Sequence, residues 1–374
     1  MKILFEIPSL GVGGPQRWVE TLLPYISESH EVAVFSYADP GNSVCEYEFL
    51  SNKTNIRVYL ANFSSNILVR NLQIITASQL SSQLLSSFDV IHANSDLWSG
   101  PILKKAKSAG VPVRIIHARN TLPTNVKMLE AIRNMIFRYY IRSSATARLA
   151  VSREAFASFF GHEPDQEKGD QVIPSALDSE RIQNLASNPT EYLNLLSPYG
   201  NCFIHVGRFH RQKNHLFLLK IFAAIKKVRP DSCLALIGVG ELPDWFHFEA
   251  KKLGVYEKII PIPPCDNVYS IMKQCADLLI FPSLWEGTPR VVAEAQICGL
   301  PVLCSEATTQ ASCFSKELFH QISLTKNETE WAETAVRIVE RLCTKKKPLT
   351  FSLPKIIIAR HQASYLTSYY QSKI

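Results

Sequence analysis

The chain of 374 residues has no pair of cysteines at CxxC spacing and no apolar run of 18 residues. The first absence excludes the common zinc and dithiol motifs. The nine cysteines, most of them in apolar runs, are therefore predicted to be buried free thiols, as in a reducing cytoplasm. The second absence excludes a membrane-spanning helix. Fixed-period repeats are also missing, so no repeat array is expected.

Acidic residues are scarce between residues 101 and 153. Glu130 is the only one there, against eleven lysines and arginines. From Lys127 to Ser144 these cations alternate with Met, Ile, Phe and Tyr, a mixture typical of a helix on an anionic membrane surface. A nucleic-acid surface is the competing interpretation, but no nucleic-acid-binding motif supports it. A helix packed on a sheet with a solvated basic edge is the third.

Short β-branched runs alternate with amphipathic stretches, which predicts doubly wound parallel α/β sheets. The chain begins with such a run rather than a signal peptide, because Glu6 and Pro8 interrupt its apolar residues. The predicted strands are residues 2–7, 31–37, 89–93, 113–118, 146–151, 202–207, 232–238, 258–262, 277–281 and 301–305.

The alternation weakens from about residue 187 to 200, where Pro, Asn, Ser and Gly mark a linker. The predicted domains are residues 1–187 and 200–353, each Rossmann-like, and a helix over about 354–374 is expected to pack back on the first. Ligands of such sheets bind at the carboxyl ends of strands, so the sites are expected to face a cleft between the domains.

The segment HVGRFHRQKNH follows the first strand of the second domain. Gly207 allows a tight turn, and Arg208 and Lys213 lie in the turn before the next helix. Two cations beside free helix N–H groups predict a diphosphate site. A solvated basic loop is the alternative.

The segment FPSLWEGTPRVVAEAQICGLPVLCS holds two glutamates eight positions apart. Glu286 precedes a helix that Pro289 is predicted to open, and Glu294 lies inside that helix. Gly287 and Thr288 stand at its start, where backbone N–H groups favour a phosphate or a polar sugar. Helix-start stabilisation and a solvated helix position are the alternatives for the two carboxylates.

In the first domain, Gly11, Gly13 and Gly14 form a loop after the first strand, but their spacing is not that of a dinucleotide fingerprint. Contact with a phosphate or substrate remains open beside a simple tight turn. His92 and His117 end two strands and are expected to point toward the same cleft. Such lone histidines are more often satisfied core residues.

Together, GRFHRQKNH, LIGVGEL, SLWEGTPRVVAEAQICGLPV and VIPSALD resemble the donor domain of retaining GT-B glycosyltransferases of family 4, in order and spacing. The segments RIIHARN and ATARLAVSREA are similar to the branch that builds capsules and exopolysaccharides. The resemblance covers nearly the whole chain. It implies a GT-B fold and transfer of a sugar from a nucleotide donor, with a UDP-sugar as the default.

The resemblance also implies residue roles. Arg208 and Lys213 match the pair that binds the donor diphosphate, so no metal ion or other cofactor is implied. Glu294 matches the carboxylate that holds the ribose hydroxyls, and Glu286 the first glutamate of the E-x7-E motif, which contacts the donor sugar. Arg290 replaces a more usual apolar residue beside the sugar site, and is expected to meet an acidic or otherwise unusual donor sugar or to face solvent.

In the first domain, Gly13 and Gly14 match the family's glycine loop near the phosphates and the acceptor, and His117 matches a histidine near the reacting centre. The expected acceptor is a lipid-linked glycan at the cytoplasmic face of a bacterial membrane. Two other interpretations are a GT-B nucleotide-sugar epimerase and a catalytically silent partner subunit. Retention of Arg208, Lys213, Glu286 and Glu294 together argues against the silent subunit.

Overall fold

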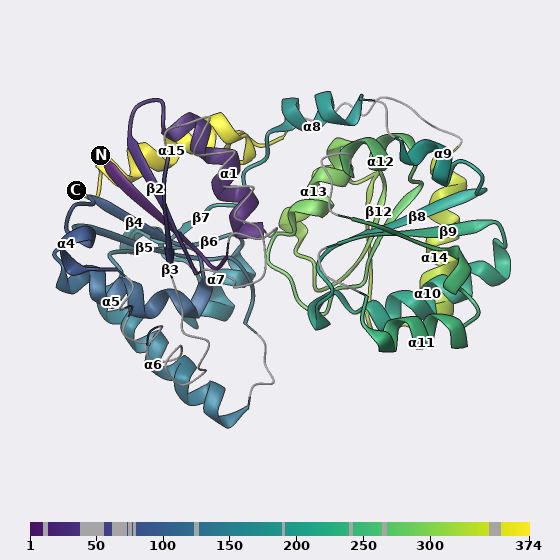
Figure 1. Ribbon diagram of the computed structural model, residues 1–374, viewed down its shortest axis with the longest axis horizontal. Helices are drawn as coiled ribbons and strands as arrows, with labels where there is room; N and C mark the ends of the chain where they lie inside the picture. The colour runs from purple at the N-terminus through teal and green to yellow at the C-terminus, as the bar shows by residue number, and fades with distance from the viewer. Residues whose placement is uncertain are drawn as a thin grey trace. The chain divides into compact units, whose positions relative to one another are not determined.

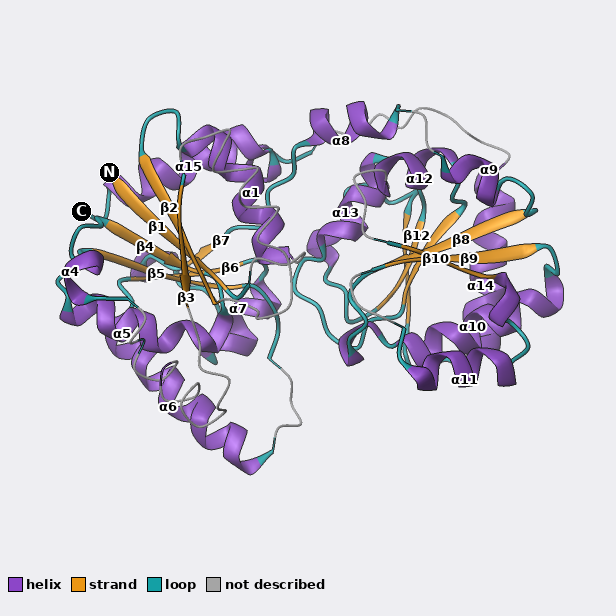
Figure 2. Cartoon of the chain, viewed as in Figure 1, coloured by secondary structure: helices purple, strands orange, loops and turns teal. Residues whose placement is uncertain are grey.

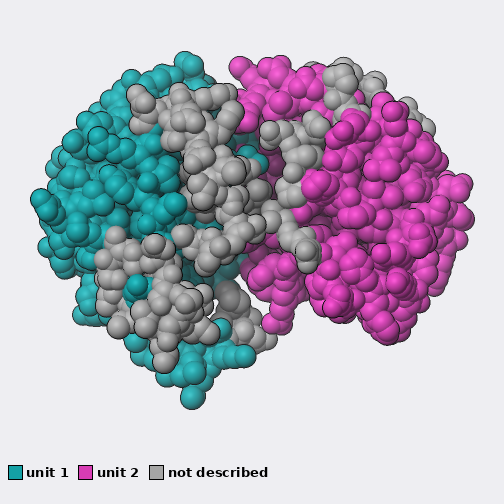
Figure 3. All heavy atoms as spheres, in the orientation of Figure 1, with its two compact units in different colours: residues 1–177, 354–374 teal, residues 178–353 magenta. Residues whose placement is uncertain are grey.

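The computed structural model (Figure 1) describes residues 1–9, 14–37, 56–61, 73, 77, 80–122, 127–188, 191–238, 242–263, 268–343 and 353–374. The chain forms two compact units (Figure 3). Unit 1 consists of residues 1–177 and 354–374, and unit 2 of residues 178–353. The division therefore falls before the predicted linker, which contains the short helix α9 (Tyr192–Leu196).

Unit 1 is built on a seven-stranded sheet in the order β3-β2-β1-β4-β5-β6-β7, in which every strand pair is parallel. Its strands are β1 (Lys2–Ile7), β2 (Glu31–Tyr37), β3 (Arg57–Ala61), β4 (Val90–Ala93), β5 (Val113–Ala118), β6 (Ala147–Ala150) and β7 (Gln171–Val172). The order of the strands reverses between β1 and β4, which makes this pair the switch point of a doubly wound sheet.

Helices pack on both faces of this sheet (Figure 2). The helices are α1 (Gly14–Ile26), α4 (Ser82–Leu85), α5 (Gly100–Ser108), α6 (Met128–Ser144), α7 (Arg153–Phe160) and α15 (Ala359–Gln371), with 3-10 turns η1 (Asp96–Ser99), η2 (Gln166–Lys168) and η6 (Lys355–Ile357). The C-terminal helix α15 lies beside α1, and the Trp18 indole N–H donates to Gln362 Oε1 over 2.6 Å.

The alternation of side chains along β1 divides the core of unit 1 in two. Ile3, Phe5 and Ile7 join the cluster that contains α1 and α15, whereas Leu4 joins the cluster under α5, α6 and α7. Glu6 has the same parity as Leu4 and is fully buried. A carboxyl group in that position needs specific partners, which the turn after β4 supplies.

Unit 2 has a six-stranded parallel sheet in the order β10-β9-β8-β11-β12-β13, with its switch point between β8 and β11. The strands are β8 (Asn201–Val206), β9 (Ser232–Ile237), β10 (Ile259–Ile262), β11 (Leu278–Phe281), β12 (Val302–Ser305) and β13 (Phe319–Ile322). Two doubly wound Rossmann-like units confirm the predicted fold class.

The helices of unit 2 also lie on both faces of its sheet (Figure 2). They are α8 (Ser179–Ala186), α9, α10 (His215–Val228), α11 (Asp244–Lys252), α12 (Val268–Gln274), α13 (Arg290–Ile297) and α14 (Glu328–Cys343), with 3-10 turns η3 (Arg211–Lys213), η4 (Tyr256–Lys258) and η5 (Gln310–Ser312). Among the helices of the described residues, none has the length and apolar character needed to cross a membrane.

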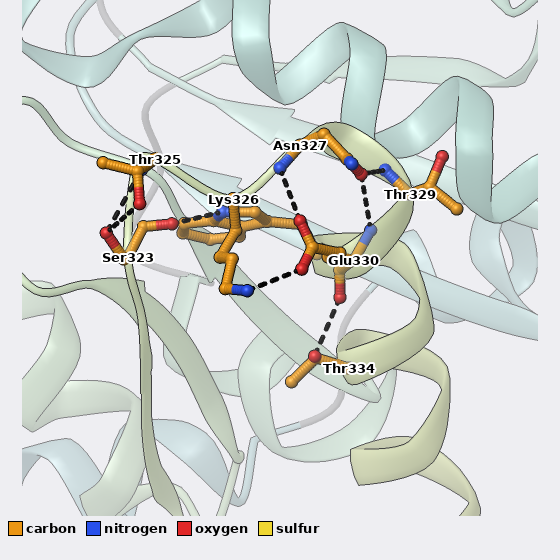
Figure 4. Close-up of polar contacts among 8 residues, drawn as sticks. Ser323, Thr325, Lys326, Asn327, Thr329, Glu330 and Thr334 are labelled. Carbon is orange, nitrogen blue, oxygen red and sulfur yellow. Dashed lines mark hydrogen bonds and ion pairs between the residues drawn. The ribbon is translucent and has the colours of Figure 1, made fainter.

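The start of α14 shows why the sequence begins a helix there (Figure 4). Asn327 Oδ1 accepts hydrogen bonds from the backbone N–H groups of Thr329 and Glu330, and Glu330 Oε2 accepts one from the Asn327 N–H, each over 3.0 Å. This reciprocal arrangement is a capping box, which satisfies N–H groups that the first helical turn leaves without intrahelical partners.

Candidate functional site

Two glycines bring the ends of β8 and β9 close together in unit 2. The Gly207 N–H donates to the Ile237 carbonyl over 2.9 Å, and a Cβ at Gly238 would collide with the Gly207 carbonyl oxygen. A Cβ at Gly207 would lie 3.2 Å from Lys213 Cε, so the lysine stem crosses directly over this turn. Glycine is therefore needed at position 238 for close approach of the two chain segments, and a side chain at position 207 would crowd the lysine stem.

Lys213 and Glu286 form an ion pair at the carboxyl ends of β8 and β11, the switch point of the sheet. Lys213 Nζ lies 2.7 Å from Glu286 Oε1, and the two side chains are only 15% and 6% exposed. Lys213 Nζ also lies 4.4 Å from the centroid of the Phe281 ring. The structure thus brings together two residues that the sequence predicts to contact the diphosphate and the sugar.

Gln212 joins the two turns that carry this ion pair. Its Nε2 donates to the Trp285 carbonyl over 2.7 Å, and its own carbonyl accepts from the Leu284 N–H over 2.8 Å. The basic turn after β8 and the Glu286 turn after β11 therefore behave as one structural element. Sequence analysis missed Gln212, since a neutral residue between two cations carries no signal of this bridge.

Arg208 is exposed on the same basic turn. Burial lowers the pKa of His210, and the positive charges of Arg208 and Lys213 lower it further. Arg208 and Lys213 thus both act on the His210 imidazole of this turn. The predicted contact of Arg208 with the donor diphosphate stays a prediction.

Glu294 lies on α13 and is mostly buried. Its Oε1 is 3.4 Å from Arg290 Nη2 and accepts a hydrogen bond of 3.4 Å from the Tyr269 hydroxyl. Arg290 therefore turns along its own helix rather than into solvent, so the expectation that it faces solvent is wrong. Tyr269, on α12, was missed because nothing in its local sequence marks it as a partner of α13.

Helix α13 begins one residue later than predicted. Pro289 is its N-cap, with φ −67° and ψ 118°, so the first helical residue is Arg290. Proline suits either position. It has no backbone N–H, and neither position forms an intrahelical hydrogen bond through its N–H. Gly287 and Thr288 are buried in the turn before it.

Two predicted residues of unit 1, Gly13 and Gly14, belong to the glycine-rich segment that follows β1 in the sequence. Gly13 falls outside the described residues. Gly14 is the first residue of α1 and is exposed, and a Cβ there would meet nothing within 4 Å. The local packing therefore does not require glycine at position 14, and its predicted contact with substrate stays a prediction.

His117 is fully buried at the end of β5, where it contacts His92 from β4. His117 Nδ1 lies 3.1 Å from His92 Nε2, and His117 Nε2 lies 3.1 Å from the Ile173 carbonyl oxygen. Burial and the nearby Arg119 cation hold the pKa of each imidazole well below its ordinary value, so both rings are neutral. The predicted place of His117 near the reacting centre, and the cleft it was expected to face, stay predictions.

Glu6 is a buried carboxyl group at the switch point of unit 1. Its Oε2 accepts from the backbone N–H groups of Asn94 and Ser95 and from the Ser99 hydroxyl. Burial nevertheless raises its pKa from 4.5 to about 7, against the opposing effect of these hydrogen bonds. Sequence analysis treated Glu6 only as an interruption of the first apolar run.

Fold and site together define a protein of two Rossmann-like units, with a basic turn and two carboxylates at the carboxyl edge of the second sheet. Residues 195–344 match the family model described as glycosyl transferases group 1. The chain is 30% identical over 253 residues to the putative glycosyltransferase EpsF of Bacillus subtilis, an alignment that covers 67% of this chain and 66% of EpsF. The chain carries a group 1 glycosyltransferase domain over residues 195–344, as predicted.

Two further comparisons extend over the whole chain. A 4-alpha-N-acetylgalactosaminyltransferase of Campylobacter jejuni, named for a diphospho-undecaprenol substrate, is 24% identical over 385 aligned positions, covering 98% of this chain and 99% of that protein. The crystal structure of HepE from Anabaena in complex with UDP-glucose is 18% identical, with a TM-score of 0.73, and covers 100% of this chain and 98% of that one. The second likeness concerns the fold.

Proposed function

We propose that the protein transfers a sugar from a UDP-sugar to a lipid-linked glycan, with retention of the anomeric configuration, during synthesis of a bacterial surface polysaccharide. The observation that carries this proposal is the pairing of Lys213 with Glu286 at the switch point of unit 2, beside the exposed Arg208. It is supported by the UDP complexes of the structural relative and by the undecaprenyl diphosphate in the name of the Campylobacter relative.

In this proposal, Arg208 and Lys213 bind the donor diphosphate and stabilise the charge that it gains as the sugar leaves. They supply the positive charge that a divalent metal ion supplies in other enzymes, so transfer needs no metal. Glu294 accepts hydrogen bonds from the ribose hydroxyls, and Glu286 contacts the donor sugar. His117 in unit 1 lies near the reacting centre.

The reaction exchanges one bond at the anomeric carbon for another. The bond from that carbon to the diphosphate oxygen breaks, and an acceptor hydroxyl oxygen bonds to the same face of the sugar. The proton of that hydroxyl passes to the leaving diphosphate, so no carboxylate of the protein has to act as the base. The role of Glu286 is then to position the sugar.

We also propose that unit 1 rests on an anionic membrane surface at the cytoplasmic face, with helix α6 as the contact. One side of α6 exposes apolar side chains, among them Leu129 at 77% and Ile136 at 41%. The exposed apolar residues are Met128, Leu129, Ile132, Met135, Ile136 and Tyr139. Their spacing places them on one stripe of the helix.

Two of the basic residues of α6 are partly engaged by the protein itself. The Arg133 guanidinium lies 4.4 Å from the Trp98 ring centroid, and Arg138 donates to the Phe159 carbonyl over 3.0 Å. The apolar stripe therefore supplies the larger share of the proposed membrane contact, and the surrounding cations add attraction to anionic headgroups.

The experiment that tests the function is a donor screen. The protein is mixed with a panel of nucleotide sugars and a polyprenyl-diphosphate glycan acceptor, and products are identified by mass spectrometry. Formation of an elongated glycan from one UDP-sugar, with the anomeric configuration kept, is the expected result. Conversion of a nucleotide sugar to its epimer without an acceptor would instead establish the epimerase, which the family match disfavours.

A further inference from the structure

The basic turn after β8 carries a third nitrogen-containing side chain, His210, between Arg208 and Lys213. The His210 N–H donates to the Arg208 carbonyl over 2.8 Å, and the Lys213 N–H donates to the His210 carbonyl over 2.9 Å. These bonds hold the three residues in one tight turn. His210 is exposed, and the turn follows β8 at the switch point of the sheet, where ligands of such sheets bind.

One hydrogen bond orients the His210 ring and assigns its proton. Its Nδ1 accepts from the Gln212 backbone N–H over 3.3 Å. A backbone N–H can only donate, so Nδ1 carries no proton, and in a neutral ring the proton is on Nε2. Gln212 also joins this turn to the Glu286 turn, so the ring is fixed to the structural element that holds the Lys213–Glu286 pair.

The surroundings keep the ring neutral and leave Nε2 accessible. Partial burial and the charges of Arg208 and Lys213 hold the pKa of His210 below its ordinary value. The ring also lies edge-on to the Trp285 indole, with centroids 6.5 Å apart. Within the described part of the chain, no group accepts a hydrogen bond from His210 Nε2. This N–H is therefore available to a bound anion.

We propose that His210 is a third diphosphate-binding residue, which donates its Nε2–H to a phosphate oxygen held by Arg208 and Lys213. This inference rests on the proposed function, in which the donor diphosphate lies at this turn. The oxygens of an ionised diphosphate are acceptors, so a neutral imidazole fixed as a donor complements them. The two cations supply charge, whereas the ring, held through Nδ1, supplies a donor in a fixed direction and so orients the phosphates.

Two substitutions separate this role from that of a cap on the turn. His210→Asn keeps an oxygen that can accept from the Gln212 N–H, as asparagine does at helix starts, but its amide does not reach the position of Nε2. His210→Gln does the reverse, because its longer side chain brings an amide N–H about as far as Nε2 and has no acceptor at the place of Nδ1.

Calorimetry in buffer without divalent metal ions measures binding of inorganic pyrophosphate and of UDP by the full-length protein. His210→Asn is expected to weaken both about tenfold, since a hydrogen bond to a charged group is worth at least that factor. His210→Gln is expected to keep most of the affinity. His361→Asn is the control, because His361 is an exposed histidine on α15 of unit 1, and it should bind both ligands as wild type does.

A third ligand identifies the source of the diphosphate. Geranyl diphosphate carries the two phosphates on a short polyprenyl chain, as a lipid-linked acceptor does, whereas UDP carries them on a nucleoside. Wild-type protein is expected to bind UDP more tightly than geranyl diphosphate, and His210→Asn to weaken UDP binding. Tighter binding of geranyl diphosphate, lost in His210→Asn, would assign the turn to the acceptor and overturn its role toward the donor.

Side-chain ¹⁵N NMR tests the proton assignment directly. Wild-type protein is expected to show His210 as the Nε2–H tautomer, with a signal that shifts when pyrophosphate binds. An Nδ1–H tautomer would contradict the assignment. Wild-type affinity in His210→Asn, or a larger loss in His210→Gln than in His210→Asn, would reduce His210 to a cap of the turn.

The same data separate this inference from the function on which it rests. A wild-type protein that binds neither UDP nor pyrophosphate would overturn the proposed donor site and, with it, the role of His210. Binding by wild type that both substitutions at position 210 leave intact would overturn the role of His210 alone.

Discussion

Lys213 Nζ and Glu286 Oε1 lie 2.7 Å apart across two turns at the carboxyl edge of unit 2, and both side chains are largely buried. The cation proposed to bind the diphosphate is thus already paired with the carboxylate proposed to contact the sugar. An incoming diphosphate must share Lys213 with Glu286. Substitution of Lys213 and of Glu286 is therefore expected to change binding of the free nucleotide and turnover of the complete donor in different ways.

Glu286→Gln is expected to tighten binding of free UDP at least about tenfold, because it removes a largely buried, charge-assisted pair that competes for Lys213 and is worth about 1.5–3 kcal/mol. The same variant is expected to lose turnover with the complete UDP-sugar, since Gln cannot offer a charged acceptor to the sugar. Calorimetry with UDP and transfer assays with the donor measure the two effects. Weaker UDP binding in this variant would place Glu286 at the nucleotide instead.

Arg208→Ala and Lys213→Ala are each expected to lower turnover on the order of a hundredfold, the usual effect of removing a group worth about 3 kcal/mol to a developing charge. Arg211→Ala is the matched control, because Arg211 is an exposed cation of the same turn. Circular dichroism should show all three folded. Equal activity of all three variants would remove the diphosphate assignment.

Glu294→Ala is expected to weaken UDP binding at least tenfold, because hydrogen bonds to a charged group are worth about 1.5–3 kcal/mol each. Binding of inorganic pyrophosphate should change little, since it has no ribose. Titration of the variant with both ligands gives the comparison. A parallel loss for both would mean that Glu294 acts only through Arg290 and the helix.

Glu6→Gln is expected to change how stability depends on pH. With its pKa raised from 4.5 to about 7, folded Glu6 keeps a proton that the unfolded chain has released, so the free energy of unfolding falls as the pH rises from about 4.5 to 7 and is level above. At about 1.4 kcal/mol per pKa unit, the variant should gain up to about 3 kcal/mol relative to wild type between pH 5 and pH 8.

Urea unfolding at pH 5 and pH 8 measures this difference. The exposed Glu28→Gln is the control for loss of one negative charge. The pKa of each buried histidine, His92 and His117, lies well below its ordinary value in the folded protein, so their protonation in the unfolded chain also makes stability depend on pH. This effect is the same in both proteins, so only the difference between variant and wild type is informative. A difference that does not vary with pH would show that Glu6 is ionised throughout.

Changing Leu129, Ile132 and Ile136 to Ser is expected to weaken binding to vesicles containing anionic lipid at least tenfold. Burial of one such side chain is worth about 1.5–3 kcal/mol, so even partial insertion of three exceeds that factor. Wild-type binding should also weaken as salt rises, through the cations around α6. Cosedimentation measures both effects.

Val228→Ser is the control for this experiment, because Val228 is exposed on α10 of unit 2 and distant in sequence from α6. Equal vesicle binding by wild type and the α6 variant would show that the apolar stripe faces something other than a membrane. The membrane part of the proposed function would then be withdrawn.

The strands at the centre of both sheets were predictable because they are buried on both faces and form apolar runs, as in LLIF of β11 and VLCS of β12. The missed strands, β3, β7 and β13, are all at sheet edges. β3 starts with Arg57, β7 has two residues, and β13 carries His320 and Gln321. Edge strands pair on one side only, so their residues need no apolar run.

Some features of the candidate site could likewise be predicted from the sequence, and others could not. The glycine, arginine, lysine and glutamate residues that follow the strands could be recognised in the sequence, because tight turns favour glycine and polar ligands favour charged side chains. That Lys213 meets Glu286, that Gln212 joins their turns, and that Tyr370 reaches His92 were decided by tertiary structure. These contacts link positions 73 and 278 residues apart in the chain, and no local pattern specifies a partner at that distance.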